Sequence, residues 1–323
     1  FIFGPSLVVL ISSFYSWNLF FLIIAPVTFL AAYLTGRICT CSSSQVSLKD
    51  IDYSGAGLLI LTCFLFMYSL VEVFKFNLSP LVFLSGLLGI LTGLFLWYHQ
   101  KHSKNPFLTT GWYRVPGILH LLGLIIVLVL VYRGAVFLSR IFLQEMAYLD
   151  PIITGLILII PGITFIPLVW LIGTYAQSWQ WKQYFRVSVV GVIFGCLGAI
   201  ALGFFHQWSS IIALLLFGAY NACIRVPMCT LFFARISEEE SGLAGGMLET
   251  CTALIIPLIV PITGASFCAG YTWLNPPPAS SSSMDEIFGH LFWGNLGDTL
   301  FFLGCCIVQM VLLIRLSRII VQK

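Results

Sequence analysis

Long apolar stretches separated by short polar segments run through the whole chain. Ten of them have the length of a membrane-spanning helix: 1–15, 17–36, 54–74, 79–98, 115–138, 151–172, 187–205, 208–230, 244–270 and 292–314. A helix of about 20 apolar residues crosses the hydrocarbon core of a bilayer, which is roughly 30 Å thick. A spanning helix also satisfies its backbone hydrogen bonds internally. The pattern therefore predicts an all-α polytopic membrane protein with about ten transmembrane helices.

The basic residues follow these stretches in a one-sided way. If the loop after the second stretch is cytoplasmic, the loops on that side hold Arg37, Lys49, Lys101, Lys104, Arg114, Lys182, Arg186, Arg235, Arg315, Arg318 and Lys323. The loops on the opposite side hold only Lys75. Because Lys and Arg accumulate in cytoplasmic loops, we expect a multi-pass protein of the cell membrane with a cytoplasmic C-terminus.

Composition supports the same protein class and excludes others. Hydrophobic residues make up 59% of the chain and charged residues 8%, whereas a soluble domain carries about 25% charged residues. The net charge of +3 therefore reflects membrane topology and predicts no nucleic-acid partner. The sequence contains no nucleotide motif, no nucleophile paired with a base and no metal-ligand spacing, so we predict a non-enzyme with no cofactor and no metal.

Small residues recur at a spacing of four in several stretches. Examples are Gly89-x-x-x-Gly93, Gly191-x-x-x-Gly195 and Ala199-x-x-x-Gly203. Helices in lipid associate where small side chains let their backbones approach closely. We interpret these motifs as contacts between helices of one chain rather than as dimerisation sites.

Several short motifs follow one another in a characteristic order. They are Gly4-Pro5, Trp17 with Pro26, Asp52-x-x-Gly55, Asn105-Pro106, Asp150-Pro151-Ile-Ile-Thr-Gly155 and Glu240-Ser-Gly242-Leu-Ala-Gly245-Gly246. This order resembles the fourteen-span drug:proton antiporter branch of the major facilitator superfamily. In that branch the fifth span carries an antiporter motif, of which Gly4 and Pro5 would be the remnant, with Val8 and Val9 in place of its glycines.

The resemblance implies a division of the chain into three parts. Residues 1–37 would be the last two spans of an N-terminal bundle. Residues 38–114 would be a polar loop, two linker spans and a basic cytoplasmic loop, and residues 115–323 a six-span C-terminal bundle. The result is a partial major-facilitator-type helical bundle that lacks the first four spans. The resemblance also implies a bacterial inner membrane.

Three polar residues lie on one face of the stretch at 115–138 and its continuation. Arg133, Arg140 and Gln144 are seven and four residues apart, a spacing that places them on the same side of a helix. A cationic stripe along a cavity would suit an anionic or polar substrate, so all three are candidate substrate-binding residues. The alternative is that Arg140 and Gln144 lie at the outer interface, with Arg140 extending its charge to water.

Two carboxylates in the last two stretches are candidates for proton coupling. Glu249 and Asp298 each lie about two turns from the start of a predicted span. A carboxylate in a partly dry environment can exchange protons near neutral pH. The alternative for both is an interfacial carboxylate in contact with water. Arg225 could pair with Glu249 across neighbouring helices as a structural ion pair.

These observations support two hypotheses about function. The first is a secondary active transporter that exports a drug-like molecule or metabolite in exchange for protons, in an N-terminally incomplete or degenerate form. Its partners would be the lipid bilayer, the substrate and protons. The second is a non-transporting membrane remnant or scaffold that binds a partner through the C-terminal bundle. The sequence indicates neither the substrate nor the oligomeric state.

Overall fold

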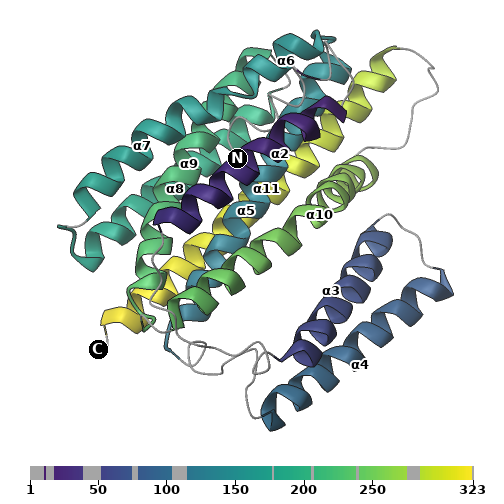
Figure 1. The fold of residues 1–323 in the computed structure, drawn as a ribbon. Coiled ribbons are helices and arrows are strands. Elements are labelled where there is room, and N and C mark those ends of the chain that lie inside the picture. The colour runs from purple at the N-terminus through teal and green to yellow at the C-terminus, as the bar shows by residue number, and fades with distance from the viewer. Residues whose placement is uncertain are drawn as a thin grey trace.

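A computed structural model describes residue 11 and residues 18–38, 52–74, 79–103, 115–176, 178–204, 207–237, 240–274 and 284–321. The described elements are all helical (Figure 1). They are α2 (Asn18–Ile38), α3 (Tyr53–Phe74), α4 (Pro80–His102), α5 (Ile118–Ile141), the π-helical turn η3 (Phe142–Met146), α6 (Pro151–Ile157), α7 (Ile160–Ala176), α8 (Trp181–Leu202), α9 (Gln207–Phe233), α10 (Ser241–Leu274) and α11 (Met284–Val321).

Eight of the ten predicted stretches coincide with helices that are long and apolar enough to cross a membrane. The stretch at 17–36 coincides with a shorter apolar helix at Phe21–Arg37 within α2. Apart from residue 11, the stretch at 1–15 lies outside the described residues, and with it the predicted motif remnant Gly4 and Pro5. The structure confirms the all-α polytopic membrane class.

One predicted stretch forms two helices instead of one. The stretch at 151–172 is divided into α6 and α7 by a turn at 158–159. Asp150 begins α6 as its N-cap, because its Oδ1 accepts a hydrogen bond of 2.7 Å from the Ile152 N–H. Pro151 at the first helical position and Pro161 just after the turn both suit helix starts, since neither needs a backbone donor there.

Helix α9 is the central element of the bundle and packs against α5, α7 and α8. Its large side chains Phe217 and Tyr220 are fully buried. Gly191 and Gly195 of α8 face it closely. A methyl group added at Gly191 would lie 2.8 Å from Ile224 Cγ1, and one at Gly195 would lie 2.8 Å from Tyr220 Cδ2. These glycines therefore pack helices within the chain, as the small-residue spacing predicted.

A buried polar bridge joins three helices of this core. The Tyr220 hydroxyl on α9 donates a 2.8 Å hydrogen bond to Oε1 of Gln309 on α11. Gln309 Nε2 donates in turn to the carbonyl oxygen of Leu124 on α5, at 3.3 Å. Buried polar groups in an apolar setting are costly without partners, so the bridge stabilises one arrangement of α5, α9 and α11.

Helices α3 and α4 form a separate hairpin beside the bundle (Figure 1). Gly89 lets the two helices approach, since a methyl group there would lie 3.2 Å from the Phe66 backbone nitrogen. The hairpin contacts the bundle through α3 and α10. Much of its remaining apolar surface is exposed, as expected of helices that face lipid.

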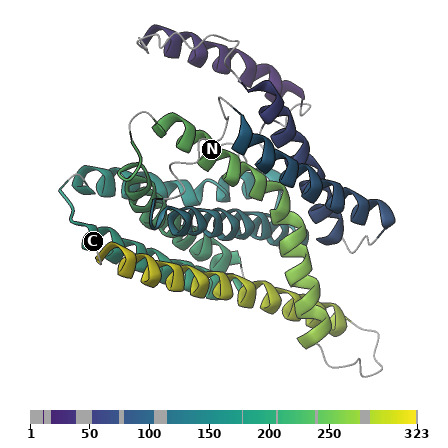
Figure 2. The same cartoon turned by 90° about the horizontal axis from the view of Figure 1, so that it is seen from below.

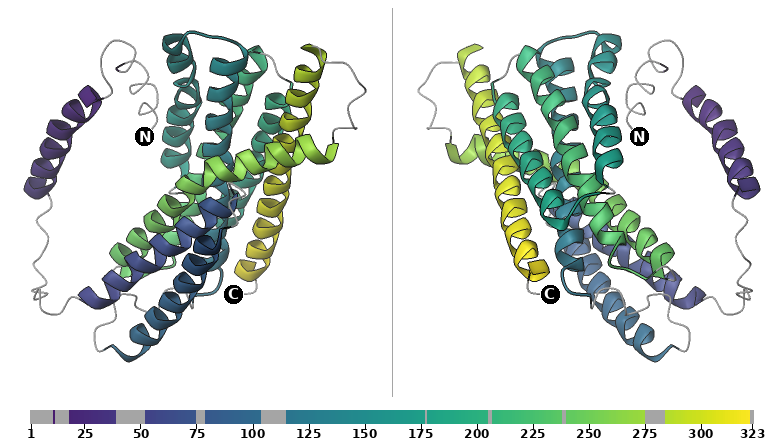
Figure 3. Two further views of the ribbon diagram at one scale, coloured as in Figure 1. Left: turned by 90° about the vertical axis from the view of Figure 1, so that its right-hand side faces the viewer. Right: turned by 90° about the vertical axis from the view of Figure 1, so that its left-hand side faces the viewer.

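Helices α10 and α2 complete the arrangement. Helix α10 contains Pro257 and Pro261 and changes direction along its length (Figure 3), as proline-containing helices do. Helix α2 lies apart from the bundle (Figures 2 and 3), and its described side chains from 21 to 37 are all exposed. The described core is therefore built from α5 and α7 to α11.

Candidate substrate pocket

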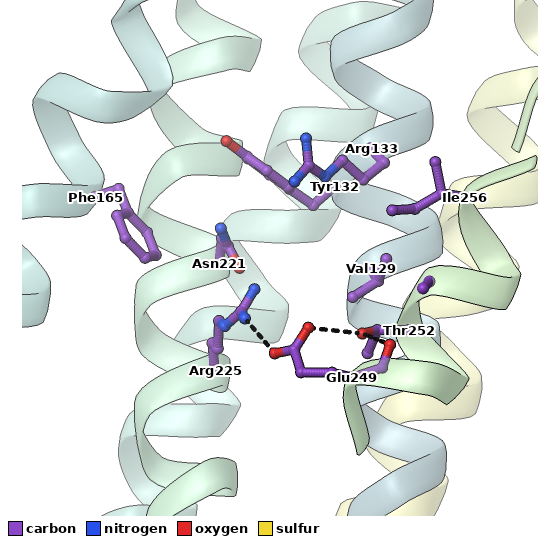
Figure 4. Close-up of a pocket in the computed structure, with 10 residues that line it drawn as sticks. Val129, Tyr132, Arg133, Phe165, Asn221, Arg225, Glu249, Thr252 and Ile256 are labelled. Carbon is purple, nitrogen blue, oxygen red and sulfur yellow. Dashed lines mark hydrogen bonds and ion pairs between the residues drawn. The ribbon is translucent and has the colours of Figure 1, made fainter. Parts of the chain in front are cut away.

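A cavity of about 460 Å³ opens between α5, α7, α9 and α10 (Figure 4). Its volume lies within the range typical of small-molecule sites, about 300–1,000 Å³. All of its lining residues belong to helices that are long and apolar enough to cross a membrane. The cavity therefore lies between helices that are able to cross a membrane, where polar and ionisable groups are usually functional.

The cavity wall combines apolar, polar and charged side chains. The apolar residues are Val129, Phe165, Ala253 and Ile256, and the uncharged polar ones are Tyr132, Asn221 and Thr252. The charged residues are Arg133 on α5, Arg225 on α9 and Glu249 on α10. An apolar wall with a few convergent polar groups is the usual composition of a ligand site.

Arg225 and Glu249 form an ion pair across the cavity. Arg225 Nη2 lies 3.6 Å from Glu249 Oε1, with 41% of the Arg225 side chain and 68% of the Glu249 side chain exposed. Glu249 Oε2 accepts a hydrogen bond of 3.4 Å from the Thr252 hydroxyl (Figure 4). The structure thus brings together the two residues that the sequence analysis suggested as a structural ion pair.

Arg133 enters the same cavity from the opposite helix. Its guanidinium carbon lies 5.9 Å from the centre of the neighbouring Tyr132 ring, a distance at which a cation is attracted to an aromatic face. In Figure 4 the Arg133 guanidinium lies beside the Tyr132 ring, whereas the Arg225 guanidinium lies further along the cavity and faces Glu249. Two cations and one carboxylate give the lining a net charge of one positive unit.

The other two members of the predicted stripe lie further along the chain. Arg140 is exposed in the last turn of α5, and Gln144 lies in the π-helical turn η3. Arg140 Nε donates a hydrogen bond of 3.4 Å to Gln144 Oε1. Neither residue lines the cavity. The structure therefore separates them from Arg133, and their role in substrate binding stays a prediction.

Asp298 on α11 lies in a different environment from Glu249. Its side chain is fully buried, and Oδ1 accepts a hydrogen bond from the Ser266 hydroxyl on α10. Within the described part of the chain, Oδ2 has no hydrogen-bond partner. The alternative of a carboxylate in contact with water is therefore wrong for Asp298, whereas Glu249 is largely exposed. Asp298 is buried because it lies against α10. The spacing of residues along the sequence could not predict this burial, because it does not show which face of a helix its neighbour covers.

A third carboxylate lies outside the membrane-spanning segments, at the base of the α3–α4 hairpin. Asp52 Oδ1 accepts hydrogen bonds of 2.8 Å from the Gly55 N–H and the Ser54 hydroxyl, and it lies 3.0 Å from His99 Nε2. Gln100 Nε2 donates to Oδ2 at 3.2 Å. Although burial opposes ionisation, the hydrogen bonds from Gly55, His99 and Ser54 hold the pKa of Asp52 well below its usual range.

The sequence analysis missed several parts of these sites. Asn221 and Thr252 line the cavity, and the available signal was a polar residue within an apolar stretch. The sequence analysis identified Asp52-x-x-Gly55 as a motif but did not identify the partners of Asp52. His99 and Gln100 could not be recognised as partners because they lie on a helix more than 40 residues away. In the part of the chain that the structure describes, no cluster of His, Cys, Asp and Glu could hold a metal ion.

The amino-acid sequence is similar to those of two efflux proteins. No family model matches the chain. The multidrug resistance protein Stp of Mycobacterium tuberculosis is 24% identical over 295 residues, which cover 89% of this chain and 54% of that protein. The drug efflux pump JefA of the same organism is 22% identical over 237 residues, covering 72% of this chain and 46% of that protein. The chain spans about half the length of these relatives.

Proposed function

We propose that the protein is a secondary active transporter of the major facilitator type, which exports a small molecule and binds it in the cavity between α5, α7, α9 and α10. The observation that carries the proposal is the cavity itself, with Arg133, Arg225 and Glu249 on helices that are long and apolar enough to cross a membrane. Ionisable residues within membrane spans are costly and are usually functional. The similarity to a multidrug resistance protein and a drug efflux pump supports the same function.

Proton exchange is the proposed driving reaction. Two carboxylates of the bundle are suited to carry a proton. Glu249 lies in the cavity and can be reached from it, and Asp298 is buried between α10 and α11 beside Ser266. We assign the coupling role to these two residues, and the substrate-binding role to Arg133, with Arg140 and Gln144 extending the site along α5. Inward proton movement through these carboxylates would drive export.

Reconstitution of the complete protein tests this function. The purified protein is placed in liposomes with a pH-sensitive dye inside, and a panel of lipophilic cations and anionic metabolites is added. We expect proton movement that depends on substrate and is absent from liposomes without protein. A well-folded protein that moves neither protons nor substrate would contradict transport and would favour the hypothesis of a remnant or scaffold.

A further inference from the structure

The charge of the cavity distinguishes between classes of substrate. Arg133 and Arg225 contribute two positive charges to its lining, and Glu249 contributes one negative charge. A cationic ligand would find one carboxylate and would face two guanidinium groups. An anionic ligand would find two guanidinium groups and would face one carboxylate. Because specificity is a difference between such affinities, the lining favours a single negative charge.

The ion pair between Arg225 and Glu249 is loose enough to be exchanged. The separation of 3.6 Å between Arg225 and Glu249 exceeds the roughly 2.7–2.9 Å of a strong charge-assisted hydrogen bond. Both side chains are also substantially exposed, and exposed ion pairs contribute little. A planar acidic group bound by two hydrogen bonds to the Arg225 guanidinium would be a stronger partner than Glu249.

The remainder of the cavity is apolar. Phe165 on α7 and Ile256 on α10 lie on opposite sides of the cavity, and Val129 lies on α5 (Figure 4). An apolar group of the ligand would be buried against these side chains, while its acidic group reached the arginines. The ligand that fits both parts is amphipathic.

We propose that the cavity selects amphipathic monoanions, whose acidic group binds Arg133 and Arg225 and displaces Glu249 from Arg225. The use of this site for export rests on the proposed function, but the binding preference does not depend on transport.

Three fluorescent probes of similar size test the preference. N-dansylglycine is a monoanion at pH 7.4, dansylethylenediamine is a cation, and dansylamide is neutral. Binding to the complete protein in lipid nanodiscs is followed by dansyl emission, with empty nanodiscs subtracted. We expect the anion to bind about tenfold more tightly than the cation, with the neutral probe between them. A cation that binds as tightly as the anion would overturn the proposal.

Variants locate the preference in the cavity. Arg133→Gln and the double variant Arg225→Gln/Glu249→Gln should each weaken anion binding about tenfold, because each removes a charged hydrogen-bond donor. The double variant removes both members of the ion pair, so it leaves no unpaired carboxylate. Arg133→Lys retains the charge and should recover most of the affinity. Arg186→Gln removes an exposed arginine of α8 outside the cavity and should change binding less than twofold.

Flux measurements with the same probes separate this proposal from the proposed function. Arginine-dependent binding of the anion without flux would support the substrate class and contradict transport. Flux of the cation without binding of the anion would support transport and contradict the substrate class. Unchanged anion affinity in both Arg133→Gln and the double variant, with normal elution and melting of both proteins, would also contradict the site.

Discussion

Two carboxylates of the C-terminal helices lie in opposite surroundings. Glu249 is 68% exposed in the cavity and lies 3.6 Å from a guanidinium nitrogen of Arg225. Asp298 is fully buried, and its described partner is the neutral Ser266 hydroxyl. Two acidic residues with the same predicted role are thus distinguished by their partners. One lies beside a cation that a ligand can also reach, and the other has no cation among the partners described.

The difference indicates a division of roles within the proposed mechanism. A carboxylate that shares its cation with a ligand responds to ligand binding, because the two anions compete for Arg225. A carboxylate buried between two helices responds to movement of those helices, because movement is needed before water or a proton can reach it. Glu249 would therefore respond to substrate binding, and Asp298 would respond to a change in the conformation of α10 and α11.

Asp298→Asn should have the largest effect. The amide has nearly the same shape but cannot carry a proton, so substrate-driven proton flux should fall by about 100-fold or more. Binding of N-dansylglycine should change less than twofold, because Asp298 does not line the cavity. Flux in proteoliposomes and binding in nanodiscs measure the two effects separately.

The matched control for this variant is Asp150→Asn. Asp150 is exposed at the N-cap of α6, and asparagine serves as well as aspartate in that position, so flux should stay near the wild-type value. If Asp298→Asn retained normal flux, Asp298 would be a structural residue and the comparison with Glu249 would lose its functional meaning.

Glu249→Gln should change binding in the opposite direction to the arginine variants. The substitution removes the carboxylate that competes with the ligand for Arg225, so the anionic probe should bind about two- to fivefold more tightly, as expected for loss of an exposed ion pair. Titration of the probe in nanodiscs measures the change. Glu240→Gln, just before α10 and outside the cavity, is the control. Weaker anion binding in Glu249→Gln would show that Glu249 supports the ligand rather than competing with it.

The lengths of the apolar stretches predicted most of the helices. Eight stretches read from the sequence coincide with helices of spanning length, because the bilayer imposes a length that composition reveals directly. The division of 151–172 into α6 and α7 was not predicted, since a proline in an apolar stretch can either kink a membrane helix or begin a new one.

The candidate site was predictable only in part. Arg133, Arg225 and Glu249 were identified because charges at membrane depth are rare. Their meeting in one cavity depends on the packing of α5, α9 and α10, which the order of residues along the chain does not specify. The same limitation applies to Arg140, whose spacing from Arg133 predicts a shared face but not where the cavity ends.

Arg140→Gln should have a smaller effect than Arg133→Gln. Arg140 is exposed beyond the cavity and contacts Gln144, and an exposed polar contact of this kind contributes little to affinity. We expect anion binding to weaken by less than about twofold. An effect equal to that of Arg133→Gln would show that the site extends along α5, as the predicted stripe implied.

Asp52 extends the comparison to a carboxylate whose ionised form is stabilised by hydrogen bonds. Its pKa in the folded hairpin is held below the usual range, despite partial burial, by Gly55, His99 and Ser54. Ionisation therefore stabilises the hairpin above the ordinary pKa of about 3.9, and this contribution is lost as the pH falls below that value. We expect Asp52→Asn to destabilise the hairpin by about 1 kcal/mol at neutral pH and to have the smallest effect of the series on ligand binding.

The pH dependence separates this local role from transport. Hydrogen exchange in the first turn of α3 should be faster in Asp52→Asn than in the wild type at pH 7. The difference should shrink when thermal unfolding of the two proteins is compared at pH 3.5, because the Asp52 carboxyl of the unfolded wild-type chain then binds a proton while that of the folded protein stays ionised. Binding of the anionic probe should be unchanged, since Asp52 lies outside the cavity. A difference that grew toward acid pH would mean that protonated Asp52, rather than its carboxylate, is the form the hairpin stabilises.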